Sequence, residues 1–149
     1  MSVLFFLLLS SAALHAAPPL NDHDALAGLK AARVIFDVRV PDNDKLIFNL
    51  ELFAETREGL LKQGVTPEMV VAFRGPGVKL LSRDAIDEEV LDLIQDLQKK
   101  GVRFEVCAVA VRTFKVDPGK LVREVKLVAN GFNSLIGYQN KGYAMIVIN

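Results

Sequence analysis

The sequence predicts an α/β protein, a three-layer α/β/α sandwich with a mostly parallel five-stranded sheet. Short apolar runs typical of strands alternate along the chain with segments in which apolar residues recur at helical spacing. Strands that alternate with helical crossovers usually form a parallel sheet with helices on both faces. The chain has 149 residues without an internal repeat or a low-complexity linker, which indicates one domain.

The first predicted strand and helix lie between residues 33 and 62. Residues 33–40 alternate, so that four apolar side chains share one face, as in a strand with one buried side. The segment 41–44 (PDND) ends that strand and offers caps for a helix. Apolar residues then recur at helical spacing over 45–62, and Gly64 is suited to end the helix.

A second strand, a second helix and a third strand follow. The strand is predicted at 69–73 and runs into Gly-Pro-Gly at 75–77. The helix is predicted from about 84 to 100, because its apolar residues form one stripe and Gly101 follows. The third strand begins at Val102. The remaining predictions are a short helix from 117, a fourth strand at 124–128, a helix around 132–139 and a buried final strand at 143–148.

Composition and charge exclude several classes of protein. The 18 basic and 18 acidic residues cancel, whereas nucleic-acid-binding proteins usually carry a basic surplus. A hydrophobic share of 51% excludes a disordered tail. The sequence contains neither a credible Ser/His/Asp set nor a cluster of metal-ligating residues. We therefore expect no metal, no cofactor and no nucleic-acid partner.

The first residues are typical of a signal peptide. The chain carries no charge before Asp22, and an apolar run at 3–9 is followed by small residues and two prolines. The alternative is a membrane anchor, but a spanning helix needs about 20 apolar residues and this run is shorter. We expect a signal peptide at 1–17, a lead-in segment at 18–31 and one domain at 32–149. The mature protein would be periplasmic or secreted and would have no membrane segment.

The predicted topology selects candidate binding residues. Ligands of parallel sheets gather at the carboxyl ends of the strands, which here are 39–44, 74–77 and the stretch from Cys107 onward. Arg74, Gly75 and Gly77 would let the backbone approach an anion, although a tight turn is the simpler interpretation. The further glycine of a dinucleotide-binding fingerprint and the Gly-Lys-Ser/Thr ending of a phosphate-binding loop are absent.

Cys107 is the single cysteine, so the chain cannot form an intrachain disulfide. A lone cysteine is usually a small buried packing residue. A reactive thiol would need a place at the end of a strand, near solvent and near a cation or a helix N-terminus. One long strand over 102–111 would bury Cys107. A strand that ends near Cys107 would instead place it beside a turn with Arg112 and Lys115, and local propensity does not decide between the two.

Three segments resemble the DsrE/DsrF-like family: GPGV at 75–78, GVRFEVC at 101–107 and YQNKGYA at 138–144. Their order and spacing match from about residue 32 to residue 148. The resemblance implies a five-stranded parallel sheet whose third strand ends at Cys107. It also implies sulfur transfer, with a persulfide carried on that cysteine, and assembly into homo-oligomers such as trimers or hexamers. Gly75 and Gly77 would shape the neighbouring loop.

Two hypotheses follow for the function. In the first, the chain is an exported sulfur carrier or sulfur-transfer protein that uses Cys107, with a sulfur donor and an acceptor still to be identified. In the second, it is a non-catalytic binding or oligomeric assembly module in which Cys107 is only a packing residue. The two differ in the native reactivity of the Cys107 thiol.

Overall fold

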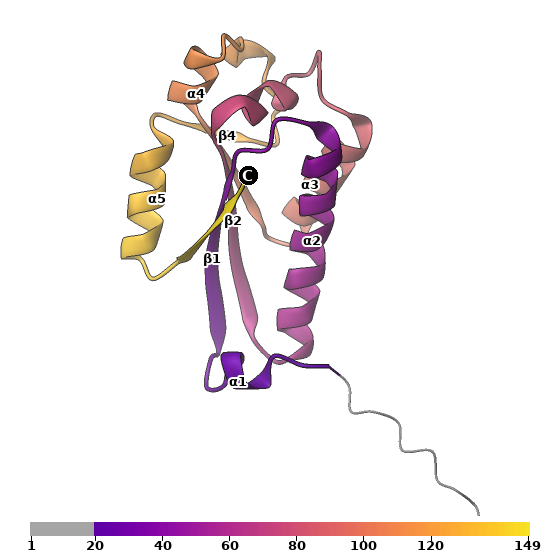
Figure 1. Cartoon of the computed structure of the whole chain (residues 1–149), viewed down its shortest axis with the longest axis vertical. Coiled ribbons are helices and arrows are strands. Elements are labelled where there is room, and N and C mark those ends of the chain that lie inside the picture. Colours follow the sequence, from indigo (N-terminus) through magenta and orange to yellow (C-terminus); the bar gives the residue numbers. More distant parts are fainter. Residues whose placement is uncertain (1–19) are drawn as a thin grey trace, which may run out of the picture.

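The computed structural model describes residues 20–149 and contains one five-stranded sheet in which all strands are parallel (Figure 1). The order across the sheet is β4-β3-β2-β1-β5. This confirms the predicted fold class. The expected signal peptide lies outside the described residues. The strands are β1 (Ala31–Val38), β2 (Thr66–Phe73), β3 (Arg103–Cys107), β4 (Lys126–Val128) and β5 (Ala144–Ile148).

The chain crosses the sheet in two directions, and this divides the helices between the two faces. From β1 to β4 each strand is added on the same side of the previous one, and the last connection then returns to the far side of β1. Because crossovers between parallel strands are right-handed, the return connection lies on the opposite face. The helices are α1 (His23–Leu26), α2 (Asn43–Lys62), α3 (Glu88–Lys99), α4 (Ala108–Thr113) and α5 (Gly131–Asn140), with 3₁₀ helices η1 (Gly75–Leu81) and η2 (Pro118–Lys120).

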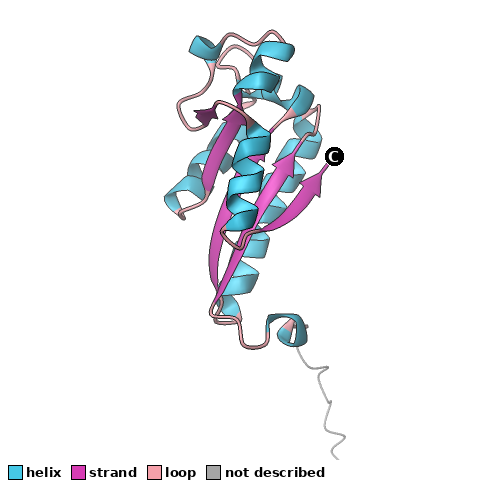
Figure 2. Cartoon of the chain, turned by 90° about the vertical axis from the view of Figure 1, so that its left-hand side faces the viewer, coloured by secondary structure: helices cyan, strands magenta, loops and turns pink. Residues whose placement is uncertain are grey.

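The core is thicker on one face of the sheet than on the other. Helices α2 and α3 cover the first face together, where the rings of Phe36 and Phe53 stack with centroids 4.0 Å apart. Helix α5 lies on the other face (Figure 1), where Leu135 packs over Ile35 and Val70. In Figure 2 the helices lie in front of and behind the strands. The predicted three layers are therefore present, but one outer layer is a single helix of ten residues.

Helix caps explain where the two longest helices begin. Asp42 is the N-cap of α2, and its side chain accepts a hydrogen bond from the Lys45 amide at 2.9 Å. Helix α3 begins at residue 88, four residues later than predicted. Asp87 is its cap and accepts from the Glu89 amide at 2.9 Å, so the chain before Asp87 forms turns instead of helix.

Two strand predictions are decided by the structure. Strand β3 ends at Cys107, so the shorter of the two alternatives is correct and α4 follows at once. The final strand was expected to be buried, and this was wrong. Strand β5 lies at the edge of the sheet, and Met145, Ile146 and Val147 are each at least 40% exposed. An apolar run does not distinguish a central strand from an edge strand.

The segment that precedes the sheet is joined to the end of α2. The expected lead-in is described from Leu20, and within it α1 is followed by the start of β1 at Ala31. The Asp22 amide donates to the Gln63 side chain at 2.8 Å, which ties this segment to the end of α2. Among residues 20–149 no helix combines the length and apolar character that crossing a membrane requires.

Candidate functional site

The carboxyl ends of three strands and the first turn of α5 meet at one place. Arg74 directly follows β2, and Cys107 is the last residue of β3. Helix α5 starts after the edge strand β4 and returns across the sheet, so its first residue, Gly131, reaches both. A Cβ atom built on Gly131 would lie 2.6 Å from Arg74 Cδ and 3.0 Å from Cys107 Cβ. Two of the candidate stretches expected from the sequence are thus neighbours.

Cys107 joins β3 to α4 and is almost completely buried. It is 5% exposed and is the N-cap residue of α4, with extended φ and ψ of −77° and 117°. The Gly131 amide donates a hydrogen bond to Cys107 Sγ at 3.1 Å. Such a bond is stronger when its acceptor is charged, and the N-terminal end of a helix favours negative charge. The thiolate is the form in which a cysteine is a nucleophile, and the Gly131 amide is placed to donate to the sulfur in that form.

A buried carboxylate and two arginines lie behind the cysteine. Arg74 Nε donates to Asp37 Oδ1 at 2.6 Å, and Arg74 Nη2 donates to Asp37 Oδ2. Arg39 donates to the same Oδ2 from Nε at 3.0 Å and from Nη2 at 2.6 Å. Asp37 is fully buried and Arg74 is 8% exposed. The two guanidinium groups share one carboxylate, so the cluster carries one net positive charge.

The two arginines decide the ionisation of Asp37. Burial raises the pKa of Asp37, but the hydrogen bonds from Arg74 and then from Arg39 lower it by more, so that it lies below its ordinary value of 3.8. Asp37 is consequently ionised at neutral pH and holds Arg74 in a fixed position. Arg39 has a half-exposed side chain and is the cation of this cluster that solvent reaches.

Phe132 covers the buried arginine. The Arg74 Cζ atom lies 4.3 Å from the centroid of the Phe132 ring, while Phe132 itself is 61% exposed. Arg74 is therefore a buried cation paired with Asp37 in this conformation, whereas the sequence offered it, with Gly75 and Gly77, as a candidate for approaching an anion. No sequence signal indicated that Gly131 and Phe132 belong to the site, because both are far from Cys107 along the chain and lie in a helix without a recognisable motif.

A family of known proteins matches the chain that forms this fold and this site. The model of the DsrE/DsrF-like family matches residues 25–148. This protein belongs to that family. The resemblance found in the sequence is thereby confirmed over nearly all of the described chain.

Individual proteins are similar to this chain in sequence or in fold. An "Uncharacterized protein" of Aquifex aeolicus (strain VF5) is 27% identical over 124 residues, which are 76% of this chain and 55% of the relative. The chain thus spans about half the length of that curated relative. Among solved structures, the protein of unknown function MTH1491 from Methanobacterium thermoautotrophicum has a TM-score of 0.66 at 24% identity, and covers 78% of this chain and 98% of its own. The ychN protein from E. coli has a TM-score of 0.57 at 13% identity, with 78% and 97% covered. At these identities the two structures support the fold.

Two glycines shape the loop after β2 of this DsrE/DsrF-like chain. Gly75 has a φ of +67°, a conformation that other residues rarely adopt. A Cβ on Gly77 would lie 2.4 Å from the carbonyl oxygen of Val40, so only glycine fits against the chain that follows β1. Gly75 and Gly77 therefore act through the backbone, and they place η1 beside the site.

A second buried carboxylate lies on the same face of β3 as Cys107. Glu105 accepts hydrogen bonds from the Ser134 hydroxyl and from Tyr138 Oη, the latter at 3.0 Å. Burial, and next the hydrogen bond to Glu105, raise the pKa of Tyr138 above its ordinary value of 10.0. This pair fixes the middle of α5 over β3, and so helps to hold the first turn of α5 at the sulfur of Cys107.

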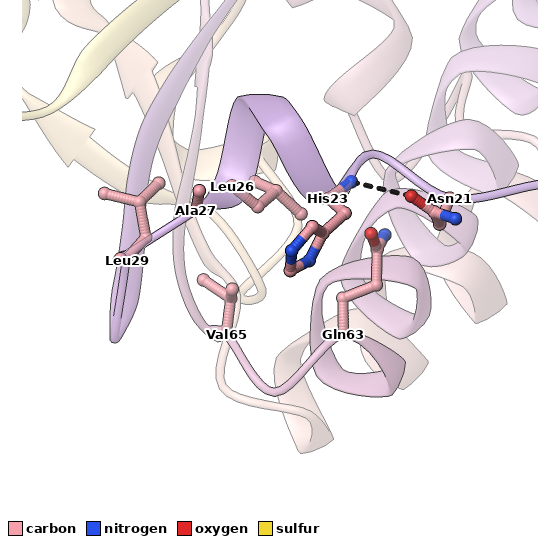
Figure 3. A pocket seen from close by; sticks show the side chains of 8 residues that line it. Asn21, His23, Leu26, Ala27, Leu29, Gln63 and Val65 are labelled. Carbon is pink, nitrogen blue, oxygen red and sulfur yellow. Dashed lines mark hydrogen bonds between the residues drawn. The ribbon is translucent and has the colours of Figure 1, made fainter.

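A separate pocket lies at the opposite end of the sheet (Figure 3). Its volume is about 310 Å³, and it is formed by α1 with the residues on both sides of it and by the turn between α2 and β2. The His23 amide donates to Asn21 Oδ1 at 3.0 Å beside it. No cysteine, carboxylate, lysine or arginine lines this pocket. Over the described part of the chain, no group of three or more His, Cys, Asp and Glu residues could hold a metal ion.

Proposed function

We propose that this DsrE/DsrF-like protein carries sulfur as a persulfide on Cys107. The observation that carries the proposal is the hydrogen bond from the Gly131 amide to the Cys107 sulfur at 3.1 Å, at the start of α5 and at the end of β3. Membership of the family supports it, since the resemblance noted in the sequence implied this chemistry. An amide that donates to sulfur favours the nucleophilic thiolate.

The reaction needs no group beyond the thiol and its two partners. The donor persulfide R–S–S⁻ first takes a proton from water, and the Cys107 thiolate then attacks the outer sulfur of R–S–SH. A new S–S bond forms on Cys107, the donor S–S bond breaks, and the donor leaves as the thiolate R–S⁻. An acceptor thiolate then attacks the outer sulfur and restores the Cys107 thiolate. The sulfane sulfur keeps its oxidation state throughout, so no external oxidant or reductant takes part.

The surroundings of Cys107 set limits on the donor. Because Cys107 is 5% exposed, a donor sulfur must approach through a narrow opening, and we expect loading to be slower than for a free thiol. The net positive charge of the Asp37, Arg39 and Arg74 cluster favours an anionic donor such as a persulfide anion. In this proposal Arg74 acts through its charge, while Gly75 and Gly77 shape the loop.

Sulfur loading can be measured directly because Cys107 is the single cysteine. The protein is incubated with a small persulfide donor under anaerobic conditions, and the intact mass is recorded. We expect one added sulfur atom on the wild type, which dithiothreitol removes, and none on the Cys107→Ser variant. Equal addition to both proteins, or no addition to the wild type, would exclude a persulfide on Cys107.

A second candidate is a binding or assembly module, and two observations favour it. Cys107 is nearly buried, as expected for a packing residue, and the edge strand β5 exposes Met145, Ile146 and Val147. An exposed apolar edge strand is a site where chains associate. We propose on this basis that the protein forms homo-oligomers, with trimers or hexamers expected from the family resemblance.

Light scattering and thiol labelling separate the two candidates. An Ile146→Lys variant should have a lower molar mass than the wild type if β5 is a contact, and an unchanged mass would remove β5 from the proposal. If Cys107 is only a packing residue, a maleimide should label it no faster than the protein unfolds. Labelling of the native protein within minutes would contradict that second candidate and support the first.

We also propose that the protein is exported, on the basis of the signal-peptide pattern of residues 1–17. Deletion of these residues should keep the protein in the cytoplasm of an expressing bacterium, whereas the full chain should appear in the periplasm or medium with a shortened N-terminus. Recovery of the full-length mass in the cytoplasm would contradict a cleaved signal peptide.

A further inference from the structure

Gly131 differs from most of the glycines that mark turns in this chain. Five glycines have positive φ, among them Gly75 and Gly142, and there the backbone conformation accounts for the residue. Gly131 is not one of them and stands in the first turn of α5. Backbone conformation therefore does not explain a glycine at this position, and the explanation must come from space.

The space beside Gly131 is filled by two residues of the site. A Cβ at this position would lie 2.6 Å from Arg74 Cδ, 3.0 Å from Arg74 Cγ and 3.0 Å from Cys107 Cβ. Separations below 3.0 Å between such atoms require a shift of one of the groups. Arg74 and Cys107 together thus leave room for a hydrogen atom and for nothing larger.

Arg74 cannot move aside easily. Its guanidinium donates to both oxygens of the fully buried Asp37, and the ring of Phe132 covers its outer side. The atoms that a side chain at 131 would meet are in the middle of the arginine, between its backbone and this anchored end. A larger residue at 131 would therefore displace the start of α5.

We infer that Gly131 is a positioning residue: the absence of its side chain lets the α5 amide reach the Cys107 sulfur. Any outward movement of α5 lengthens the 3.1 Å distance between Gly131 N and Cys107 Sγ. Beyond about 3.6 Å between donor and acceptor, a hydrogen bond from an amide to oxygen is no longer effective, and a sulfur acceptor extends this limit by only a few tenths of an ångström. The thiolate of Cys107 would then lose its donor.

The charges around the sulfur do not change when Gly131 is replaced. Helix α5 contains no charged residue, and the groups that face Cys107 from neighbouring elements all remain. A change in thiolate formation in a Gly131 variant must therefore come from the position of the helix and its amide. No charged residue of the neighbouring elements is altered either: these are Glu68 in β2, Arg74 after it, Lys79 in η1, Arg103 and Glu105 in β3, Lys126 in β4 and Arg112 in α4, with Asp37 paired to both Arg74 and Arg39.

The test follows thiolate formation by ultraviolet absorbance as pH is raised, with Cys107→Ser as the blank. The full-length protein has one cysteine, so the signal has one source. In Gly131→Ala we expect the midpoint to move up by about one pH unit, and the thiolate fraction at lower pH to fall about tenfold. Gly137→Ala is the matched control, because a Cβ on Gly137 in the same helix meets nothing within 4 Å. Its midpoint should equal that of the wild type.

A second variant removes the hydrogen-bond donor without adding a side chain. Replacement of Gly131 by glycolic acid in a semisynthetic chain exchanges the N–H for an ester oxygen. Its midpoint should rise as in Gly131→Ala, and this decides the matter even if the alanine variant does not fold. An unchanged midpoint in the glycolic acid chain, or an equal rise in Gly137→Ala, would overturn the inference.

This inference deepens the proposed function and rests on it for its biological meaning, but its readout is independent. Thiolate formation is measured without a sulfur donor. A normal shift in Gly131→Ala together with no sulfur loading of the wild type would reject the persulfide carrier and keep Gly131 as a positioning residue. Sulfur loading that is equal in both proteins, with equal midpoints, would keep the carrier and reject the role of Gly131.

Discussion

The buried ion pair at the site predicts a large loss of stability in Arg74→Met. Methionine keeps an unbranched stem beside Gly131 and removes the charge, so that Asp37 retains Arg39 as its single cation. Asp37 is fully buried and Arg74 is 8% exposed. Removing one partner of such a pair costs about 3–5 kcal/mol. We expect about 3 kcal/mol, because Arg39 still donates to Asp37 Oδ2.

Urea unfolding followed by far-ultraviolet circular dichroism measures this loss. With a slope of about 1.5 kcal/mol per molar urea, the midpoint should fall by about 2 M. Arg39→Met is the control, since its side chain is 42% exposed and a partly solvated pair contributes about 1 kcal/mol or less. If Arg74→Met loses no more stability than Arg39→Met, the buried Arg74–Asp37 pair contributes no more to the free energy of unfolding than the partly exposed Arg39–Asp37 pair, and the reasoning is refuted.

The same pair predicts how stability depends on pH. The pKa of Asp37 is below its ordinary value of 3.8 in the folded protein, because the hydrogen bonds from Arg74 and Arg39 outweigh the opposing effect of burial. Its stabilisation is therefore complete above the unfolded pKa and is lost as pH falls through the lower folded value. The difference between wild type and Arg74→Met should narrow below about pH 4. A difference that stays constant into strong acid would contradict this assignment.

Two further predictions concern the surroundings of the site. Gly77→Ala should cost at least about 2 kcal/mol, since its Cβ would lie 2.4 Å from the Val40 carbonyl oxygen, while Gly59→Ala in open space should be neutral or slightly stabilising; equal effects in urea unfolding would refute the close approach. In a Tyr143→Phe variant, ultraviolet titration should show the Tyr138 phenol ionising above pH 10.0, because burial raises its pKa. The contribution of the neutral phenol to the free energy of unfolding should be lost as pH rises through the pKa of Tyr138 in the folded protein. Ionisation at or below 10.0 would contradict the buried position.

The succession of strands and most helices along the chain could be predicted because periodicity and end signals agree. The residues 43–62 of α2 carry both an apolar stripe and a capping aspartate, so only the first two residues differed from expectation. Strand β3 could not be bounded in the same way, since its apolar run continues into α4 without a break. The family resemblance, rather than propensity, favoured the end at Cys107 that the structure has.

The site itself was predicted only in part. The carboxyl-end rule placed Arg74 and Cys107 at the same edge, because it depends on topology alone. It could not supply Gly131, which reaches the cysteine from a segment 24 residues later in the chain. Nor could it supply the pairing of Asp37 with Arg74, since an aspartate in an alternating strand reads as solvent-facing. These contacts join segments that are far apart in the chain, and local sequence patterns do not indicate which distant segments pack together.

The position of β5 has a consequence for how the molecule assembles. Strand β1 pairs on one side with β2, which follows it closely in the chain, and on the other side with β5, so that Val34 meets Ala144. During synthesis the outer edge of β1 therefore stays unpaired until almost the whole described chain has left the ribosome. Contacts between such distant segments form slowly, and an open edge invites pairing with other chains. We expect refolding yield to depend steeply on protein concentration, and substitutions in β5 to lower yield more than they lower the stability of protein that has already folded.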